Sequence, residues 1–421
     1  MLADARQIAG AVSARELDPV GVVEHALRAI EAHETLNAFI TVCADHALSR
    51  ARETLSGPLA GVPLLVKDVF DTAGIRTTVG SRIYANRVPE ATAPTVRALE
   101  AAGAIMIGKT GCDEFAWGVT GQNHHYGDVR NPRRPGFITG GSSSGNGAAL
   151  AAGIAPLAIG TDTGGSVRMP AACCGVVGMK PRVGALGTQG IFPLCPSFDT
   201  PGPMARTVAE CALAYEVLAG VKLPEDDRRE VRVGLLTAMP PLAPDGPAAA
   251  RDERALQFGA RLEDLGMRCE EVALPVPEAD IWPVFYGEAA AVHRDTFPAR
   301  RDEYGPIIRA KLDDAQQMPA EAVDAGRRAL GAWRARAQDE PDVDVIVSPT
   351  LGVREIPTAD VDELEIRVTF SAYTRAFSFL GWPAIAVGDV QFAAREPEQL
   401  FGVALAWERS AAHAPAERGG R

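Results

Sequence analysis

The sequence lacks any hydrophobic run long enough to cross a membrane. A spanning helix needs about 20 consecutive apolar residues, whereas the apolar segment at residues 148–159 is short and interrupted by glycine. The N-terminal stretch MLADARQIAG also lacks the basic and then apolar pattern of a secretory signal. We therefore expect a cytoplasmic protein without a membrane partner.

Signals for disulfides and for metal sites are also missing. The chain has seven cysteines, an odd number, and none of them forms a CxxC pair. This usage favours reduced thiols, as in cytoplasmic proteins. The His, Cys, Asp and Glu residues show no spacing typical of metal ligands. Neither a metal nor another cofactor is therefore expected.

An excess of positive charge is missing as well, since 42 Lys and Arg residues stand against 54 Asp and Glu residues. The formal net charge is −12, whereas contacts to nucleic-acid phosphates need clustered lysine and arginine. We therefore expect no nucleic-acid partner. The glycine-rich loop at residues 140–147 contains neither GxxxxGK[ST] nor a GxGxxG that follows a strand, so it does not match the common phosphate-binding loops.

What the sequence does have is 421 residues, of which 47% are hydrophobic, and this is ample for a large core. Short apolar runs alternate with segments whose apolar residues recur at helical spacing. This alternation predicts an α/β fold with a largely parallel or mixed central sheet. Strands are expected at residues 61–69, 104–108, 156–160, 231–236 and 343–347, and helices within 4–55 and at 93–102, 144–153, 207–218, 251–265 and 319–337.

Two segments between these elements have a different composition. Residues 113–147 are rich in Gly, Asn, Arg and Pro, which predicts a long surface loop of the kind that often carries function. Residues 221–230 are highly charged. They form either a linker before a later lobe or a surface loop.

Two loops rich in glycine and serine, at residues 140–147 and 161–166, are the most informative feature. Glycine permits close backbone approach, so N–H groups and serine hydroxyls can face a reacting atom. Serine alone is a poor nucleophile and needs a base. Ser142 of the first loop can relay the proton of Ser166, in the second loop, to Lys67. The apolar neighbours of this lysine in GVPLLVKDVFD favour a neutral amine, because desolvation lowers the pKa of a lysine.

The first loop also matches the pattern G-x-S-x-G. That pattern would make Ser143 the nucleophile of an α/β-hydrolase. Such a site needs an acidic residue and then a histidine further along the chain. Only His293 and His413 lie downstream, and His413 falls in the expected tail, so this is the weaker hypothesis.

Four segments together resemble the amidase signature family, whose members use a Ser-cisSer-Lys triad. The lysine segment is GVPLLVKDVFDTAG, and the strand and loop after it read GKTGCDEFAWGVTGQNHHYGDVRNP. The signature itself is similar to GGSSSGNGAALAAGIAPLAIGTDTGGSVRMPAACCGVVGMKP, and PSFDTPGPMAR resembles the segment that follows. The spacing of Ser142 and Ser166 agrees with the family, and the resemblance extends over residues 59–220.

The resemblance implies a single α/β domain over residues 1–421. Its mixed sheet of about eleven strands would be covered by helices on both sides. Within this domain we expect N-terminal helices at 1–57, the signature core at 58–220, a variable C-terminal lobe at 221–410 and a disordered tail at 411–421.

The resemblance also assigns roles in a reaction. Ser166 is implied to be the nucleophile that becomes acylated, Ser142 to be a bridging serine beside a cis peptide bond, and Lys67 to be the general base and later the acid. The implied oxyanion hole consists of the backbone N–H groups of Thr163, Gly164, Gly165 and Ser166.

Residues close to these motifs provide candidates for contact with the substrate. These candidates are Gly141, Trp117, His125 and Arg168. We expect Arg168 to pair with an acid such as Asp199, and contact with an acidic substrate is its alternative role. Asp162 is expected to hold the second loop by hydrogen bonds rather than to act as an acid.

The C-terminal third departs from the family pattern. Many members carry a G-L-P-x-G-x-Q segment where this chain reads DVQFAAREPEQLFGVALAWERS. We expect the stretch FGVALAWE, residues 401–408, to replace it as a strand. This region commonly shapes the acyl pocket in the family, so the substrate of a relative cannot be transferred to this chain.

Three functions are compatible with these motifs. The first is an amidohydrolase that cleaves the carbon–nitrogen bond of a small amide or urea-like substrate. The second is the amidase subunit of a glutamine-dependent amidotransferase, which DEFAWG and NHHYGDVRNP resemble but which the altered C-terminus disfavours. The third is an acyl-transfer enzyme of a biosynthetic pathway. The expected partners are a small-molecule amide and a second copy of the chain in a homodimer, with an amidotransferase partner less favoured.

Overall fold

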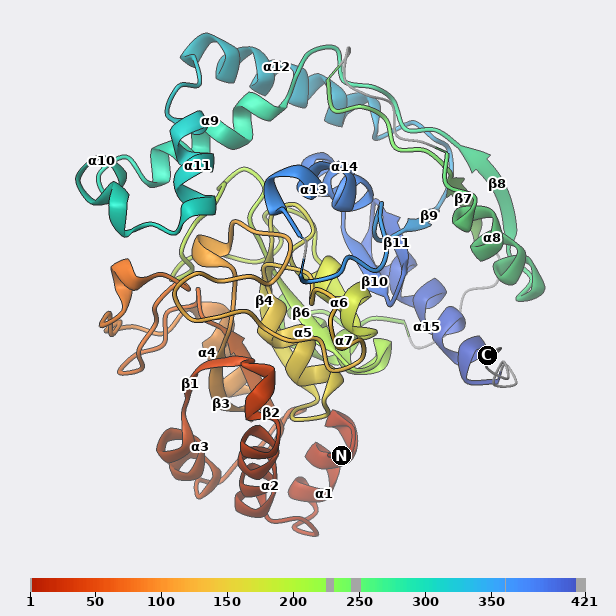
Figure 1. Cartoon of the computed structure of the whole chain (residues 1–421). Coiled ribbons are helices and arrows are strands. Elements are labelled where there is room, and N and C mark those ends of the chain that lie inside the picture. Colours follow the sequence, from red (N-terminus) through yellow and green to blue (C-terminus); the bar gives the residue numbers. More distant parts are fainter. Residues whose placement is uncertain (1, 225–230, 244–250, 360, 414–421) are drawn as a thin grey trace.

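The computed structural model describes residues 2–224, 231–243, 251–359 and 361–413. Within them, eleven strands form one sheet in the order β1-β3-β2-β4-β6-β5-β10-β11-β9-β7-β8. Helices cover both sides of the sheet (Figure 1). The strands are β1 Phe39–Val42, β2 Pro63–Lys67, β3 Ile105–Thr110, β4 Leu157–Asp162, β5 Val177–Lys180, β6 Thr200–Ala205, β7 Arg232–Leu236, β8 Arg268–Val272, β9 Val345–Pro349, β10 Ala384–Val387 and β11 Val390–Ala394.

The sheet is mixed, which confirms the predicted fold class. β2 pairs in parallel with β3 and β4, and β7 pairs in parallel with β8 and β9. The other neighbours are antiparallel. The predicted strands appear as β2, β3, β4, β7 and β9, and the predicted helices beyond residue 55 appear as α4, α5, α7, α8 and α12.

Two groups of helices lie at opposite ends of the molecule. α1 to α3 lie at the N-terminal end, and α9 to α12 form an arch at the opposite end of the molecule (Figure 1). No helix of the described residues is long and apolar enough to cross a bilayer. The helices are α1 Ala5–Ser13, α2 Pro19–Ala32, α3 Ala44–Ala51, α4 Pro94–Ala101, α5 Ser144–Ala151, α6 Arg168–Cys174, α7 Val208–Ala219, α8 Arg254–Asp264, α9 Trp282–Val292, α10 Phe297–Arg300, α11 Pro306–Ala315, α12 Ala320–Arg336, α13 Glu363–Phe370, α14 Ala372–Leu380 and α15 Pro397–His413, with short 3₁₀ turns at Glu34–Leu36, Arg82–Tyr84, Glu114–Ala116 and Arg301–Glu303.

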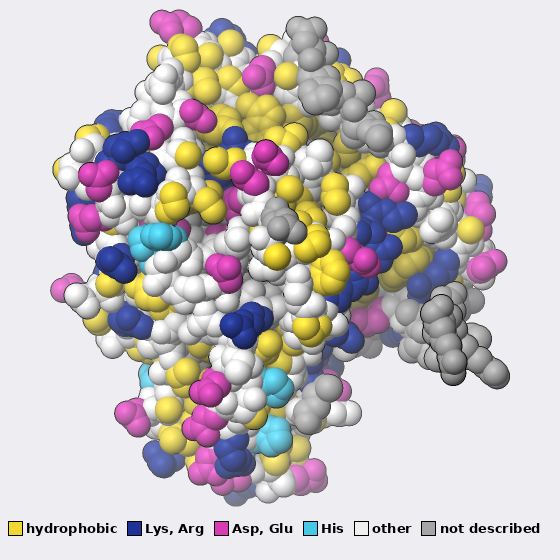
Figure 2. Space-filling model, viewed as in Figure 1, with side chains coloured by type: hydrophobic (Ala, Val, Ile, Leu, Met, Phe, Trp, Pro, Cys, Tyr) yellow, Lys and Arg dark blue, Asp and Glu magenta, His cyan; other side chains and the backbone are white. Residues whose placement is uncertain are grey.

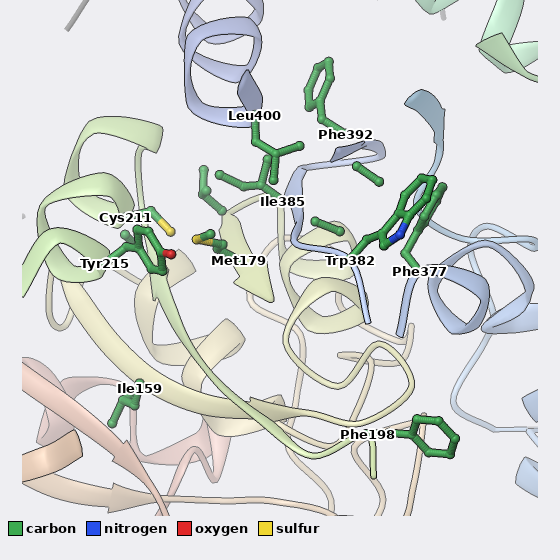
Figure 3. Packing of buried hydrophobic residues seen from close by; sticks show 14 of the residues in the cluster. Ile159, Met179, Phe198, Cys211, Tyr215, Phe377, Trp382, Ile385, Phe392 and Leu400 are labelled. Atoms are coloured by element: carbon green, nitrogen blue, oxygen red, sulfur yellow. The ribbon is translucent and has the colours of Figure 1, made fainter. Parts of the chain in front are cut away.

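The central strands are buried on both faces. Leu64 and Val66 of β2 belong to one hydrophobic cluster, whereas Leu65 between them belongs to a second cluster on the other face. Successive side chains of a strand point to opposite faces, so an uninterrupted apolar run fits a strand covered on both sides. Figure 3 shows part of the first cluster, in which Leu400 of α15 and Ile385 of β10 are packed.

One continuous sheet joins the signature core to the C-terminal lobe. β5 pairs antiparallel with β10, with Lys180 opposite Ala384 and Val177 opposite Val387. β10 in turn follows α14 in the chain. The register of this strand pair therefore fixes where α14 lies relative to the loops of the signature core.

The sequence pattern predicts helices over residues 4–55, but the structure also contains a strand in this segment. α1, α2 and α3 are present, but β1 lies between α2 and α3. Asn37, two residues before β1, adopts a left-handed conformation with φ 52°, which breaks the helical path. β1 then pairs with β3 at the edge of the sheet.

The prediction of a surface loop over residues 113–147 was wrong for both of its ends. Residues 113–118 and 138–147 are buried, and the exposed part lies between them. Side chains satisfy the buried backbone, which allows a loop to lie inside the protein. Asp113, for example, accepts hydrogen bonds from the N–H groups of Thr120 and Gly121.

The expected strand at residues 401–408 is instead part of helix α15. Leu400, Val403, Ala404 and Trp407 are buried, and their spacing of three or four residues is helical rather than alternating. α15 continues to His413, so the first residues of the expected disordered tail are helical. The rest of that tail, and residues 225–230 of the charged segment, lie outside the described residues.

Candidate active site

Lys67 ends β2 and is completely buried. Its Nζ donates hydrogen bonds of 2.8 Å to Ser142 Oγ and to Thr161 Oγ1. Burial lowers the pKa of Lys67 to about 8, although the charges of Cys112, Asp113, Asp162 and Asp199 act in the opposite direction. No carboxylate of the described residues forms an ion pair with Lys67. The amine can therefore be neutral near physiological pH and accept a proton.

Ser142 lies in the loop before α5, and the Gly141–Ser142 peptide bond is cis. The sequence resemblance had implied a cis bond on one side of this serine. The N–H of Gly141 donates to the carbonyl oxygen of Val119 at 2.8 Å. A Cβ at this glycine would lie only 2.5 Å from Asp113 Oδ1, so no other residue type fits without moving that carboxylate.

Ser166 lies in the loop between β4 and α6 and is 6% exposed. The carbonyl oxygen of Ser166 accepts a 3.0 Å hydrogen bond from the N–H of Ser143. This bond places the two serine loops side by side. Ser166 also lines a pocket of about 350 Å³, together with Thr163 and Gly164, so its hydroxyl is next to space that a small substrate can occupy.

Asp162 holds the second loop in position, as predicted. Its Oδ1 accepts a 2.7 Å hydrogen bond from the N–H of Gly165, and its carboxylate pairs with Arg168 at 2.9 Å. Burial opposes ionisation, but the Arg168 guanidinium lowers the pKa of Asp162 below its usual value. Asp162 is therefore a charged loop brace and not a proton donor.

Three of the four backbone N–H groups of the implied oxyanion hole have no hydrogen-bond acceptor among the described residues. Because Gly165 N–H is bonded to Asp162, the implied oxyanion hole loses this member. The N–H groups of Thr163, Gly164 and Ser166 donate to no other group within the part of the chain that the structure describes. Asp199 steadies this turn, since Thr163 Oγ1 donates to its Oδ1 at 2.6 Å.

Arg168 pairs with an acid, as predicted, but the acid is Asp162 rather than Asp199, and the structure gives no support to the alternative role in substrate contact. Arg168 is fully buried, and its guanidinium donates to Asp162, Gln391 and Ser378. It does not line the pocket. The short separation of Asp162 and Arg168 along the chain lets both groups meet, whereas Asp199 is engaged by Thr163 and by two backbone N–H groups.

Of the other substrate candidates, only Trp117 lines the pocket. His125 does not line the pocket; its side chain is 5% exposed, and its Nε2 lies 2.9 Å from Glu114 Oε1. Gly141 lies against Asp113 and outside the pocket lining.

Two residues beside the triad candidates were not singled out from the sequence. Thr161 receives a hydrogen bond from Lys67, and its place at the end of a predicted strand carried no distinct signal. Asp113 lies against the cis peptide bond, and burial together with the charge of Glu363 raises its pKa to about 7. Among the described residues, no group of His, Cys, Asp and Glu side chains could hold a metal ion.

The pocket wall beside Ser166 is largely aromatic. Trp117 comes from the loop after β3, Trp282 and Phe285 from α9, and Phe379 from α14. Hydrophobic side chains gather on the face of the molecule below the arch of α9 to α12 (Figure 2). Such a wall suits the apolar part of a small substrate.

Comparison with known proteins identifies the family. A family model described as Amidase matches residues 21–398. A glutamyl-tRNA(Gln) amidotransferase subunit of Symbiobacterium thermophilum is 42% identical over 296 residues, which make up 63% of this chain and 59% of that relative. An amidase crystal structure superimposes with a TM-score of 0.85 at 28% identity, covering 97% of this chain and 100% of its own. The native peptide amidase of Stenotrophomonas maltophilia has a TM-score of 0.80 at 28% identity, covering 97% of each chain. This chain therefore belongs to the amidase signature family.

Proposed function

We propose that this chain is an amidohydrolase that cleaves the carbon–nitrogen bond of a small linear amide through an acyl-enzyme on Ser166. The observation that carries the proposal is the buried Lys67 Nζ, 2.8 Å from Ser142 Oγ and without a carboxylate partner among the described residues. A desolvated amine is the base that a serine nucleophile needs.

The first half of the reaction forms the acyl-enzyme. Ser166 Oγ attacks the carbonyl carbon while its proton passes to Ser142 Oγ, and the proton of Ser142 passes to Lys67 Nζ. The carbonyl oxygen becomes an oxyanion, and the free N–H groups of Thr163, Gly164 and Ser166 stabilise it. When the carbon–nitrogen bond breaks, the ammonium of Lys67 returns a proton through Ser142 to the leaving nitrogen, which departs as ammonia or an amine.

The second half reverses the same proton path with water as the nucleophile. Water loses a proton through Ser142 to Lys67 and attacks the ester carbonyl. The tetrahedral intermediate collapses, Ser166 regains its proton, and a carboxylic acid leaves. The fixed contact between the two loops, Ser143 N–H to Ser166 carbonyl, supports this route because the relay needs both hydroxyls in a constant arrangement.

Trapping the acyl-enzyme tests the proposal. A fluorophosphonate should add one phosphonyl group to the wild-type chain, and peptide mass spectrometry should locate it on Ser166. The Ser166→Ala variant should take up no label, and Ser49→Ala, at an exposed position of α3, should be labelled like the wild type. Label on Ser143 or on a cysteine would refute the assignment.

A second candidate is the amidase component of an amidotransferase. The 42% identity to the glutamyl-tRNA(Gln) amidotransferase subunit favours it. Here the ammonia released by the same chemistry would pass to a partner protein. Glutaminase activity that appears only with a stably co-purifying partner would select this candidate, whereas turnover of simple amides by the isolated chain would select the first. We also propose a cytoplasmic location, which the seven free cysteines support.

A further inference from the structure

The pocket next to Ser166 is lined by three cations and by no carboxylate. Lys311, Arg367 and Arg375 line it. Lys311 is neutralised, because its ammonium pairs with Glu363 and donates to the carbonyl oxygen of Trp117 at 2.7 Å. The two arginines have no ion-pair partner among the described residues, so the pocket keeps their positive charge.

Arg375 is the more constrained of the two arginines. It is 8% exposed. Its Nε donates to the carbonyl oxygen of Ser371 at 3.3 Å, and one Nη donates to that of Val368. Its guanidinium carbon lies 4.7 Å from the centre of the Trp282 ring. These contacts fix the plane of the guanidinium and leave the other Nη without a hydrogen bond to any described residue.

A buried guanidinium without a counter-charge is costly unless a ligand supplies the charge. The free-energy cost of removing a cation from water is offset when an anion pairs with it and accepts its hydrogen bonds. Burial lowers the pKa of Arg375 to about 10, and the charge of Arg367 acts in the same direction. The side chain therefore remains a cation at neutral pH and lies near a second one.

Arg375 is also next to the loop that carries the nucleophile. The position of a Cβ on Gly164 would be 3.6 Å from Arg375 Cγ. The preceding residue, Thr374, donates from Oγ1 to the carbonyl oxygen of Gly164 at 2.7 Å. A group bound at the guanidinium would therefore lie in the same pocket as Ser166.

We propose that Arg375, assisted by Arg367, is a carboxylate-binding subsite, and that the substrate is an amide whose acyl chain ends in a carboxylate. Monoamides of linear dicarboxylic acids belong to this class. Their methylene groups would lie on Trp282 and Phe285, and a guanidinium binds a carboxylate through charge-assisted hydrogen bonds. The reaction part of this inference rests on the proposed function, whereas anion binding by the two arginines does not.

Binding without turnover provides the first test. Calorimetric titration of Ser166→Ala protein with succinate and glutarate should show binding that weakens with added salt, because charged pairs are screened. The neutral diamides of these acids should bind at least about tenfold more weakly. Adding Arg375→Gln should weaken dicarboxylate binding about 10- to 100-fold. Adding Arg28→Gln, an exposed arginine of α2, should not change it.

Substrate preference provides the second test. The wild type should release ammonia from succinamate and glutaramate with a kcat/KM at least about tenfold above that for butyramide and valeramide. Arg375→Gln should lower this ratio about tenfold or more, mainly through KM. Arg375→Lys keeps the charge but loses the paired N–H donors of the guanidinium. Its ratio of kcat/KM values should lie between those of the wild type and Arg375→Gln. Arg28→Gln should keep the wild-type ratio.

The outcomes separate the subsite from the reaction. Anion binding that depends on Arg375, with no turnover of any amide, would refute the proposed function and leave the subsite standing. Turnover of neutral and anionic amides with equal kcat/KM, unchanged in ratio by Arg375→Gln, would refute the subsite and leave the function standing. If circular dichroism shows that Arg375→Gln is unfolded, two milder variants decide between these outcomes. Arg375→Lys keeps the charge at this position, and Arg367→Gln keeps the backbone contacts of Arg375.

Discussion

Ser143 N–H donates a 3.0 Å hydrogen bond to the carbonyl oxygen of Ser166. This bond joins the loop of Ser142 to the loop of the proposed nucleophile, and Ser143 Oγ adds a second one to the carbonyl oxygen of Thr161 at 3.4 Å. Its donor is on the first residue after Ser142, so any shift of one loop moves the other with it. The proposed relay from Ser166 to Lys67 would therefore be held by main-chain contacts as well as by side chains.

Removing the proposed base should stop the reaction. Lys67→Met keeps most of the side-chain volume but has no amine, so Ser142 would have no proton acceptor. Ammonia release from an amide substrate should fall at least about 10³-fold, in line with losses of general-base catalysis. Ser166→Ala should be equally inactive, whereas Ser142→Ala should keep a trace of activity. Ser49→Ala is the matched control, and full activity of Ser166→Ala would contradict the scheme.

Activity should rise with pH through the titration of Lys67. The base works only when neutral, and burial lowers its pKa to about 8. A plot of log kcat/KM against pH should therefore climb with unit slope below about pH 8 and level off above it. A steady-state profile measured between about pH 6 and 10 checks this. If log kcat/KM instead levelled off only near the ordinary pKa of lysine, the amine would not be desolvated during the reaction.

Gly141 should not tolerate a side chain. A Cβ there would be 2.5 Å from Asp113 Oδ1, and this carboxylate is held by the N–H groups of Thr120 and Gly121. Overpacking of this kind costs about 1–3 kcal/mol, so Gly141→Ala should lower the free energy of unfolding by that amount in urea. Gly331→Ala is the control: α12 has open space there, and alanine should raise stability by up to about 1 kcal/mol.

Arg168 should matter for stability and not for contact with the substrate. Arg168→Met leaves the Asp162 carboxylate buried and unpaired, which costs about 3–5 kcal/mol. Urea denaturation at neutral pH should show this loss. Arg28→Met removes an exposed pair with Glu24 and should change stability by less than about 1 kcal/mol. A normal unfolding midpoint with a raised KM would instead return Arg168 to the substrate site.

The sequence singled out the three triad candidates more clearly than the pocket around them. Lys67, Ser142 and Ser166 stand in segments whose composition is unusual, so their types and spacing are informative by themselves. The pocket wall is different, because Trp282 and Phe379 lie on helices with ordinary apolar spacing. Nothing in such a pattern distinguishes a side chain that lines a pocket from one in the core.

Other misses have a similar physical origin. Leu400, Val403 and Trp407 recur at helical spacing, which indicates a helix. The prediction of a strand at residues 401–408 relied instead on the family segment that this stretch was expected to replace. Arg168 was assigned to the wrong acid because sequence alone does not show which carboxylate faces a buried guanidinium. Arg375 carried no signal, since its distinguishing property is the lack of a neighbouring acid among the described residues, and only coordinates reveal this.

The pairing of β5 with β10 makes the two parts of the chain dependent on one another for folding. A fragment that stopped after α7 would expose the free edge of β5 to solvent and would lack the covering supplied by α14 and α15. Open strand edges recruit other chains, so such a fragment is expected to aggregate. The loops of Ser142 and Ser166 and the pocket wall therefore depend on the same continuous sheet, so we expect that neither can be transferred to another protein without the other.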